Sequence, residues 1–449
     1  MLTVAERATR LVRFGVYALA IVGVQVAAGA AATGSTSAAL AAVGVAVAIP
    51  LALMSPVWIA TLALPCVVLS SQRLGSGGVD LSYADAALVG ATLLALREAP
   101  WDAPVLRRAI WGAGAYMVML SFTVLWTPTV RGVLEWLHRG ELVIGSIVVG
   151  SAIGAADKAR AALRLYLGAS LAIAVGAIVF SLAHGFEPAY PFGVIHKNAG
   201  GTFLAAALII SIVAAREVAL PRPLVIGMQV MFLVGLLACQ ARGASVAFMI
   251  VLLLVSARRR ARGILIPLVG VTALAVMIYS SVQKDSLSDA EAEKFGSVGT
   301  RVISYETSLQ YWRENPIFGA GMRFFKDPTL MRHLFTIEPH SVVIGALAET
   351  GIVGLGALVL LNGAVLVLFR RRRDPLGQAA YYLTIAHVVD SLVGIFWVAG
   401  TGTLPWLVVG LAAASTGEVV SSGSLVLPAR FESIRSTDEA ARRRLQPGI

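Results

Sequence analysis

The chain has 449 residues, of which 57% are hydrophobic and only 14% are charged. Soluble domains are typically about 45–50% apolar and about 25% charged, so this composition excludes a disordered chain and a string of soluble domains. The formal net charge is +11, but the basic residues stand in short clusters between long apolar runs. That arrangement is typical of cytoplasmic membrane loops and argues against a nucleic-acid partner.

Apolar segments of about 20 residues, each long enough to cross the bilayer as a helix, recur throughout residues 1–427. We therefore expect an all-α, polytopic integral membrane protein with about 12 to 14 transmembrane helices. The number of crossings between residues 38 and 97 stays open. The segments begin near residues 14, 38, 57, 83, 109, 141, 165, 199, 224, 243, 263, 342, 376 and 404.

The basic residues indicate the topology. If the N-terminus is placed in the cytoplasm and successive segments alternate sides, 24 of the 36 Lys and Arg residues fall on the cytoplasmic side. The positive-inside rule therefore assigns both termini to the cytoplasm, including a charged C-terminal tail at residues 428–449. The two cysteines, Cys66 and Cys239, lie in apolar runs, so neither a disulfide framework nor a metal site is predicted.

One long polar loop, residues 283–341, is predicted on the outer side of the membrane. Within it, Thr300–Asn315 is predicted to form an amphipathic helix, because apolar residues recur at three- and four-residue intervals. Pro316 ends that helix, and Gly319 and Gly321 then permit a tight turn. The residues of the predicted apolar face are Val302, Tyr305, Leu309 and Trp312.

The sequence contains no Walker-type phosphate loop, no His-Glu-x-x-His zinc pair and no Gly-x-Ser-x-Gly elbow. The candidates for a site are therefore polar residues at the outer ends of spans, where charge is costly. Arg242 stands there between two apolar runs, and its planar guanidinium suits a phosphate, unless it only snorkels from a helix end. At the mouth of another span, Lys197 could bind a phosphate beside His196, and Asn198 could cap the following helix. The alternative is an ordinary helix start with interfacial charges.

The outer loop adds further candidates. Arg301 lies at the start of the predicted helix, where the helix dipole does not favour a cation. It could bind an anion or simply lie on the surface. Arg313 and Arg323 follow later in the loop. His340 stands where the loop re-enters the membrane, and its imidazole could act as a base on a hydroxyl or be an interfacial histidine. Glu349 lies further along the same span, too far from His340 for contact along one helix face.

His387 and Asp390 are three residues apart and share a face of their predicted span. A polar pair inside a span could relay protons, but a structural hydrogen bond is the favoured interpretation.

Three segments, residues 240–245, 299–321 and 339–355, flank the long loop. Read together, they resemble the O-antigen ligase / O-antigen polymerase superfamily of bacterial integral-membrane glycosyltransferases. The resemblance covers about residues 195–370. Ser341 follows His340 where the family usually has asparagine, and Ala241 precedes Arg242 where it usually has serine.

The resemblance implies transfer of a glycan from an undecaprenyl-diphosphate (polyprenyl-diphosphate) carrier to a sugar hydroxyl of a lipid- or wall-linked acceptor. The reaction would take place at the outer face of the bacterial inner (plasma) membrane, without metal, nucleotide or other cofactor. Arg242 and Arg301 would bind the diphosphate with help from Lys197, and His340 would orient or deprotonate the acceptor hydroxyl. The supporting residues would be His196, Asn198, Arg313, Arg323 and Glu349.

Other functions stay open at this point. A polymerase that joins two lipid-linked repeat units would use the same donor chemistry as a ligase. A secondary transporter or flippase would be expected to show inverted repeats and broken helices at mid-membrane. No repeat is evident, the conspicuous charges cluster outside, and a transporter would not need the long outer loop. A structural membrane scaffold would leave Arg242 and Arg301 unexplained.

Overall fold

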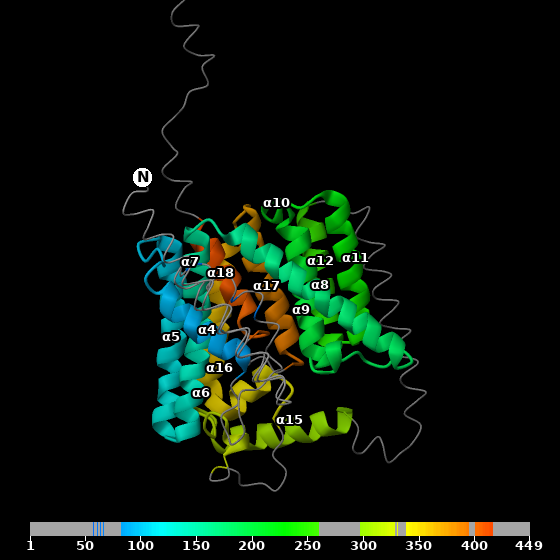
Figure 1. Ribbon diagram of the computed structural model, residues 1–449. Coiled ribbons are helices and arrows are strands. Elements are labelled where there is room, and N and C mark those ends of the chain that lie inside the picture. Colours follow the sequence, from blue (N-terminus) through cyan, green and yellow to red (C-terminus); the bar gives the residue numbers. More distant parts are fainter. Residues whose placement is uncertain are drawn as a thin grey trace, which may run out of the picture.

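The computed structural model describes Val57, Thr61, Ala63, Cys66 and residues 82–259, 297–327, 330, 338–394 and 400–415. Every regular element named within these ranges is a helix (Figure 1), which confirms the all-α prediction. The segments predicted near residues 14, 38 and 263 and the tail at 428–449 lie outside the described residues.

The helices occupy the positions of the other predicted apolar segments. In chain order they are α4 (Tyr83–Ala95), α5 (Pro104–Trp126), α6 (Val130–Gly140), a π-helical turn (Glu141–Gly145), α7 (Ser146–Ala155), α8 (Ala159–Ala183), a 3-10 turn (Pro191–Gly193), α9 (Lys197–Val213), α10 (Ala215–Val218), α11 (Arg222–Cys239), α12 (Arg242–Arg259), α15 (Ser297–Glu314), a 3-10 turn (Phe324–Lys326), α16 (Val342–Phe369), α17 (Pro375–Ser391) and α18 (Leu404–Ala414).

Among the described residues, four helices are long and apolar enough to cross a membrane: α5, α8, α11 and α16. Shorter apolar helices accompany them, among them α9 and α18. Large apolar side chains point outward from the long helices; Trp111 is 77% exposed and Leu125 75% exposed. Such outward apolar surface suits contact with lipid, so the helices form a polytopic membrane domain.

Small residues let the helices approach closely. α7 packs against α18, and a Cβ at Gly150 or Gly410 would overlap a backbone carbonyl of the other helix. Interfaces of this kind are typical of membrane helices, where packing and not apolar attraction drives association.

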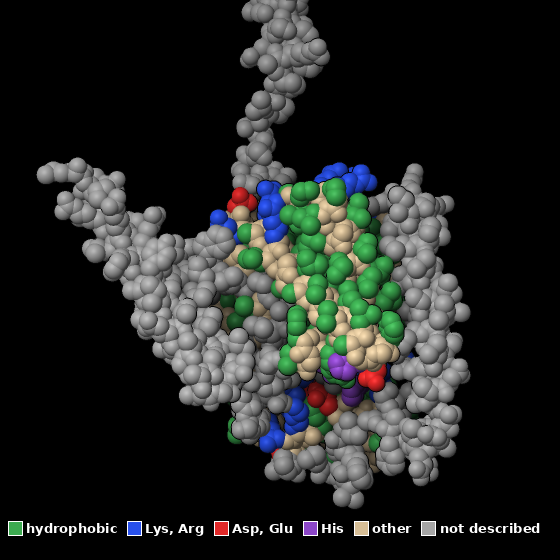
Figure 2. All heavy atoms as spheres, turned by 45° about the vertical axis from the view of Figure 1, so that its right-hand side comes forward, with side chains coloured by type: hydrophobic (Ala, Val, Ile, Leu, Met, Phe, Trp, Pro, Cys, Tyr) green, Lys and Arg blue, Asp and Glu red, His purple; other side chains and the backbone are tan. Residues whose placement is uncertain are grey.

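Helices α10 (Ala215–Val218) and α15 lie at opposite ends of the bundle. At the end that carries α10, Arg160 and Arg164 donate hydrogen bonds to the carbonyl oxygens of Glu217 and Val218. Helix α15 lies across the other end (Figure 1). Figure 2 shows a band of hydrophobic side chains between these ends, with Lys and Arg side chains along its upper edge.

Helix α15 lies where the loop helix was predicted, but its buried face is different. The buried side chains are Ser304, Ser308 and Tyr311, whereas Val302 is 48% exposed. α15 packs against α16, and the two serines allow a close approach that larger apolar side chains would prevent. Val302, on the apolar face named from the sequence, is thus turned away from the protein interior.

Candidate functional site

Three helices bring cations to one place at the end of the bundle that carries α15. Lys197 is the first residue of α9, Arg242 is the first residue of α12, and Arg301 lies in the N-terminal part of α15. The charges of Arg242 and Arg301 both act on the Lys197 ammonium group. We call these three residues the cation cluster. Such a group of like charges suits a multiply charged anion.

Two histidines border the cation cluster. The positive charge of Arg301 acts on the His340 imidazole. The charges of Lys197 and His340 act on the His196 imidazole. Burial lowers the pKa of His340, and the neighbouring Arg301 lowers it further. Burial and Lys197 lower the pKa of His196 in the same way. Both imidazoles are therefore held in the neutral form near neutral pH, the form that can accept a proton.

The backbone of His340 is fixed from both sides. The Tyr305 hydroxyl of α15 donates a hydrogen bond of 3.0 Å to the His340 carbonyl oxygen. Ser341 is the N-cap of α16, and its hydroxyl accepts a bond from the Ile344 N–H. Among the described atoms, His340 Nδ1 is buried without a hydrogen-bond partner. The imidazole therefore stands beside Arg301 with its Nδ1 shielded from solvent.

The cap of α9 differs from the prediction. His196, not Asn198, is the N-cap residue, and its Nδ1 accepts a bond of 3.3 Å from the Asn198 N–H. The prediction of an Asn198 cap is therefore wrong, because the imidazole one residue before the helix already satisfies this orphan amide. The Asn198 carbonyl oxygen accepts a bond from Thr202 in the next turn.

Arg313 and Arg323 do not join the cation cluster. Arg313 is an exposed residue of the last turn of α15. It is twelve residues after Arg301, which places it about 18 Å further along the helix. Its position near the C-terminus suits the helix dipole. Arg323 lies beyond the turn after α15, with its Nε 2.8 Å from Glu135 and its Nη1 3.7 Å from Glu338.

Arg323 belongs to a buried ionic network that the sequence interpretation missed. Arg139 of α6 contacts both Glu135, at 2.9 Å, and Glu349. The network extends through His138, whose Nε2 lies 2.9 Å from Asp85 of α4. Burial opposes the charged imidazole, but hydrogen bonds to the two carboxylates raise the pKa of His138 to about 9. The only signal in the sequence is the i, i+3 and i+4 spacing of these polar residues on α6.

The turn after α15 is inserted into a break in α16. Gly351 interrupts α16 with φ +62° and ψ −161°. The Ile352 and Val353 N–H groups donate to the carbonyl oxygens of Pro316 and Ile317. The Ala320 and Gly321 N–H groups donate in return to the carbonyl oxygens of Ala348 and Glu349. Two of the three segments that carry the family resemblance are thus one packed unit.

His387 and Asp390 have separate neighbours. The Asp390 carboxylate accepts a hydrogen bond of 2.7 Å from Thr202 of α9, and the His387 ring lies edge-on to Trp406 with centroids 6.1 Å apart. The hydrogen bond that involves Asp390 therefore links two helices. Within the described ranges, no group of three His, Cys, Asp or Glu side chains is placed to hold a metal ion.

Comparison with known proteins agrees with the resemblance read from the sequence. A family model described as O-Antigen ligase matches residues 227–359, a range that contains Arg242, Arg301 and His340. The match confirms the similarity to the O-antigen ligase superfamily, a family of membrane glycosyltransferases. The chain is also 33% identical over 97 residues to "Lysophospholipid transporter LplT" of Enterobacter sp. (strain 638). That similarity covers 21% of this chain and 24% of the transporter, so the chain spans about a quarter of that relative's length.

Proposed function

We propose that this protein moves a glycan from a polyprenyl-diphosphate carrier to a sugar hydroxyl of a lipid- or wall-linked acceptor, as an O-antigen ligase does. The observation that supports the proposal most strongly is the convergence of Lys197, Arg242 and Arg301 beside His340. The site would face the outside of the inner membrane, with both chain termini in the cytoplasm.

The cation cluster would bind the diphosphate. As the bond between the anomeric carbon and the phosphate oxygen breaks, its electron pair stays on that oxygen, and negative charge on the diphosphate grows. Fixed cations that are already in place stabilise this charge without reorganising, which is the largest catalytic contribution in many enzymes. The donor therefore needs no metal ion and no nucleotide.

His340 would act on the acceptor. The acceptor oxygen forms the new bond to the anomeric carbon while its proton passes to the neutral imidazole. Because Arg301 disfavours a second positive charge nearby, His340 is unprotonated in the resting site. The same arginine would gain a partner when the diphosphate enters. Lys197 and its neighbour His196 would complete the anion side of the site.

The proposal is tested with purified full-length protein, a polyprenyl-diphosphate glycan and candidate acceptors, with product mass as the readout. We expect Arg301→Ala to lower the transfer rate by about 100-fold or more, the usual effect of losing one such donor. Arg313→Ala, on the same helix but outside the cluster, should retain the wild-type rate. Full activity of Arg301→Ala, or activity that a chelator abolishes, would overturn the proposal.

The same assay separates a ligase from a polymerase. A glycan that has moved to a different lipid or to a wall acceptor identifies a ligase. A longer glycan that stays on the polyprenyl carrier identifies a polymerase of lipid-linked repeat units. The donor-binding residues would have the same roles in both reactions.

A second candidate is a secondary transporter or flippase, which the partial similarity to the lysophospholipid transporter favours. Transport would move an intact lipid across the bilayer and break no glycosidic bond. Protein reconstituted in vesicles with a labelled lipid-linked glycan decides between the two: a labelled acceptor supports transfer, and relocation of an unchanged donor supports transport.

A further inference from the structure

Two helices that begin with residues of the cation cluster, α9 and α12, meet α17 at a single carboxylate. Asp390 is the penultimate residue of α17 and is only 6% exposed. Its Oδ2 accepts a hydrogen bond of 2.7 Å from the Thr202 hydroxyl of α9. Its Oδ1 faces Gly243 of α12, where a Cβ would overlap it. The carboxylate therefore lies between the N-terminal turns of the two helices that begin with Lys197 and Arg242.

Thr202 joins this carboxylate to the first turn of α9. Its hydroxyl oxygen lies 2.7 Å from Asp390 Oδ2 and 3.0 Å from the Asn198 carbonyl oxygen, one helical turn earlier. Asn198 is the residue after Lys197, so a movement of Thr202 toward or away from α17 moves the lysine with it.

Glycines on both helices make the spacing tight. A Cβ at Gly201 would overlap the Cβ of Ala241, the residue before Arg242. Gly243, on the other side of Arg242, approaches Asp390 with no side chain between them. The starts of α9 and α12 are therefore in contact with each other and with the Asp390 carboxylate, and a change at any one of these contacts alters the separation of the two cations.

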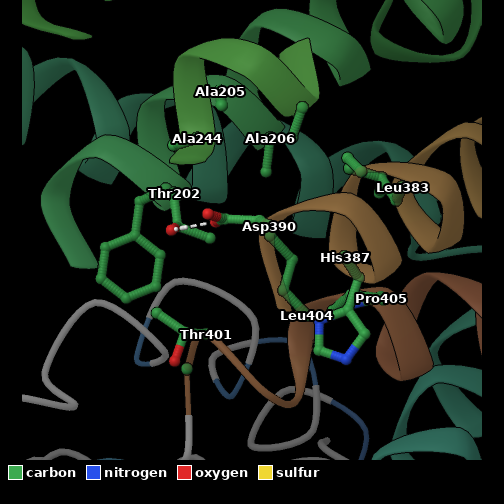
Figure 3. A pocket seen from close by; sticks show the side chains of 14 residues that line it. Thr202, Ala205, Ala206, Ala244, Leu383, His387, Asp390, Thr401, Leu404 and Pro405 are labelled. Atoms are coloured by element: carbon green, nitrogen blue, oxygen red, sulfur yellow. Dashed lines mark hydrogen bonds between the residues drawn. The ribbon is translucent and has the colours of Figure 1, made fainter. Parts of the chain in front are cut away.

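Figure 3 shows Thr202 and Asp390 facing one another on the wall of a small pocket between α9, α12, α17 and the start of α18. The pocket has a volume of about 30 Å³ and is lined largely by alanine and other apolar side chains. A carboxylate on such a wall is costly unless it is hydrogen-bonded, so the Thr202 bond strongly favours one arrangement of the helices.

We propose that Asp390 and Thr202 are positioning residues that set the separation of Lys197 and Arg242 for a ligand with two linked phosphates. The inference rests on the proposed function, because it takes the cation cluster as the diphosphate site. Neither residue needs to touch the ligand. The spacing of the cations matters for a diphosphate, which can engage both at once, and much less for a monophosphate, which can engage either one alone.

The test measures binding of a polyprenyl diphosphate and of the corresponding polyprenyl monophosphate to the purified full-length protein in lipid nanodiscs. Thr202→Val keeps the shape of the side chain and removes the donor, whereas Thr202→Ser keeps the donor. Thr384→Val is the matched control, because Thr384 is a buried threonine of α17 whose hydroxyl, among the described residues, bonds the Ala380 carbonyl of its own helix at 2.8 Å and no other helix. Asp390→Ala removes the acceptor from the other side.

We expect Thr202→Val and Asp390→Ala to weaken diphosphate binding by about tenfold, the usual effect of one hydrogen bond, with a much smaller change for the monophosphate. Thr202→Ser and Thr384→Val should bind both ligands as the wild type does. Equal weakening for both ligands, equal weakening by Thr384→Val, or unchanged binding in Thr202→Val would overturn the inference. If Thr202→Val does not fold, Thr202→Ser and Asp390→Ala carry the same comparison. A wild-type protein that binds no diphosphate would instead overturn the proposed function.

Discussion

Arg139 of α6 and Glu349 of α16, 210 residues apart in the chain, form an ion pair in which the side chains are 2% and 5% exposed. Glu349 also accepts a hydrogen bond of 3.3 Å from the backbone N–H of Arg323. This pair ties the membrane helices to the loop that follows α15. It also gives Glu349 a place in the molecule that is distinct from the cation cluster.

Loss of one partner of this pair should destabilise the protein. Glu349→Gln removes one of the two carboxylates that contact the buried Arg139 guanidinium, the other being Glu135. Breaking a buried pair in this way typically costs about 3–5 kcal/mol. We expect a clear fall in the thermal unfolding midpoint in detergent. Glu306→Gln, an exposed position of α15, is the control and should unfold as the wild type does. An unchanged midpoint for Glu349→Gln would contradict this role.

Gly351→Ala should disrupt the break in α16. The backbone of Gly351 lies in a region of φ and ψ that is essentially restricted to glycine, and a Cβ there would overlap the Ile317 carbonyl oxygen. We expect loss of both stability and transfer activity. Gly356→Ala is the matched control on the same helix, because nothing lies within 4 Å of its added Cβ. Equal behaviour of the two variants in thermal unfolding would show that the break tolerates a side chain.

The pH dependence of transfer should report His340. Burial and the charge of Arg301 lower the pKa of His340 below its usual value of 6.5. A base works in its neutral form, so activity should be retained at pH 6.5 and be lost only as the pH falls further through the lowered pKa. The measurement is kcat/KM across the acid range. Arg301→Lys keeps the positive charge, so its residual activity should still fall only below pH 6.5, as in the wild type. In Arg301→Gln, the pH at which activity falls should be higher than in the wild type. A fall in wild-type activity that begins above pH 6.5 would refute the assignment.

Because of His138, the free energy of unfolding should fall as the pH rises into the alkaline range. Its pKa is raised from 6.5 to about 9, so the folded state holds a proton that the unfolded state releases. The stabilisation is fully present below pH 6.5 and is lost as the pH rises through about 9. We expect the unfolding midpoint of the wild type to fall over this interval more steeply than that of His138→Gln. Parallel curves for the two proteins would rule out this contribution.

The positions of the described helices along the chain were largely predictable because apolar length is a strong signal in membrane proteins. The turn at Gly319 and Gly321 was also predictable, and both residues have positive φ, at +75° and +111°. The structure places Arg242, Arg301, Lys197 and His340 near one another, whereas their roles in catalysis and binding stay predictions. No local pattern distinguishes these residues from interfacial charges; their position at the outer ends of helices was the useful signal.

What could not be predicted depends on partners far away in the chain. Glu135 and Arg139 read as ordinary polar residues of a short helix, and only the fold brings Glu349 and Arg323 to them. The bond between Thr202 and Asp390 spans 188 residues. Two of the side chains that α15 buries are the serines Ser304 and Ser308, which an apolar pattern does not reveal.

The four backbone hydrogen bonds that join residues 316–321 to the break in α16 limit how far this turn can move. If this turn lifted away, eight polar groups of the main chain, four N–H and four C=O groups, would lose their partners beside a span, at a cost of several kcal/mol. Residues 316–321 are therefore expected to stay attached to α16. If His340 acts on a bulky acceptor as proposed, that acceptor reaches it by a route that leaves these four bonds in place.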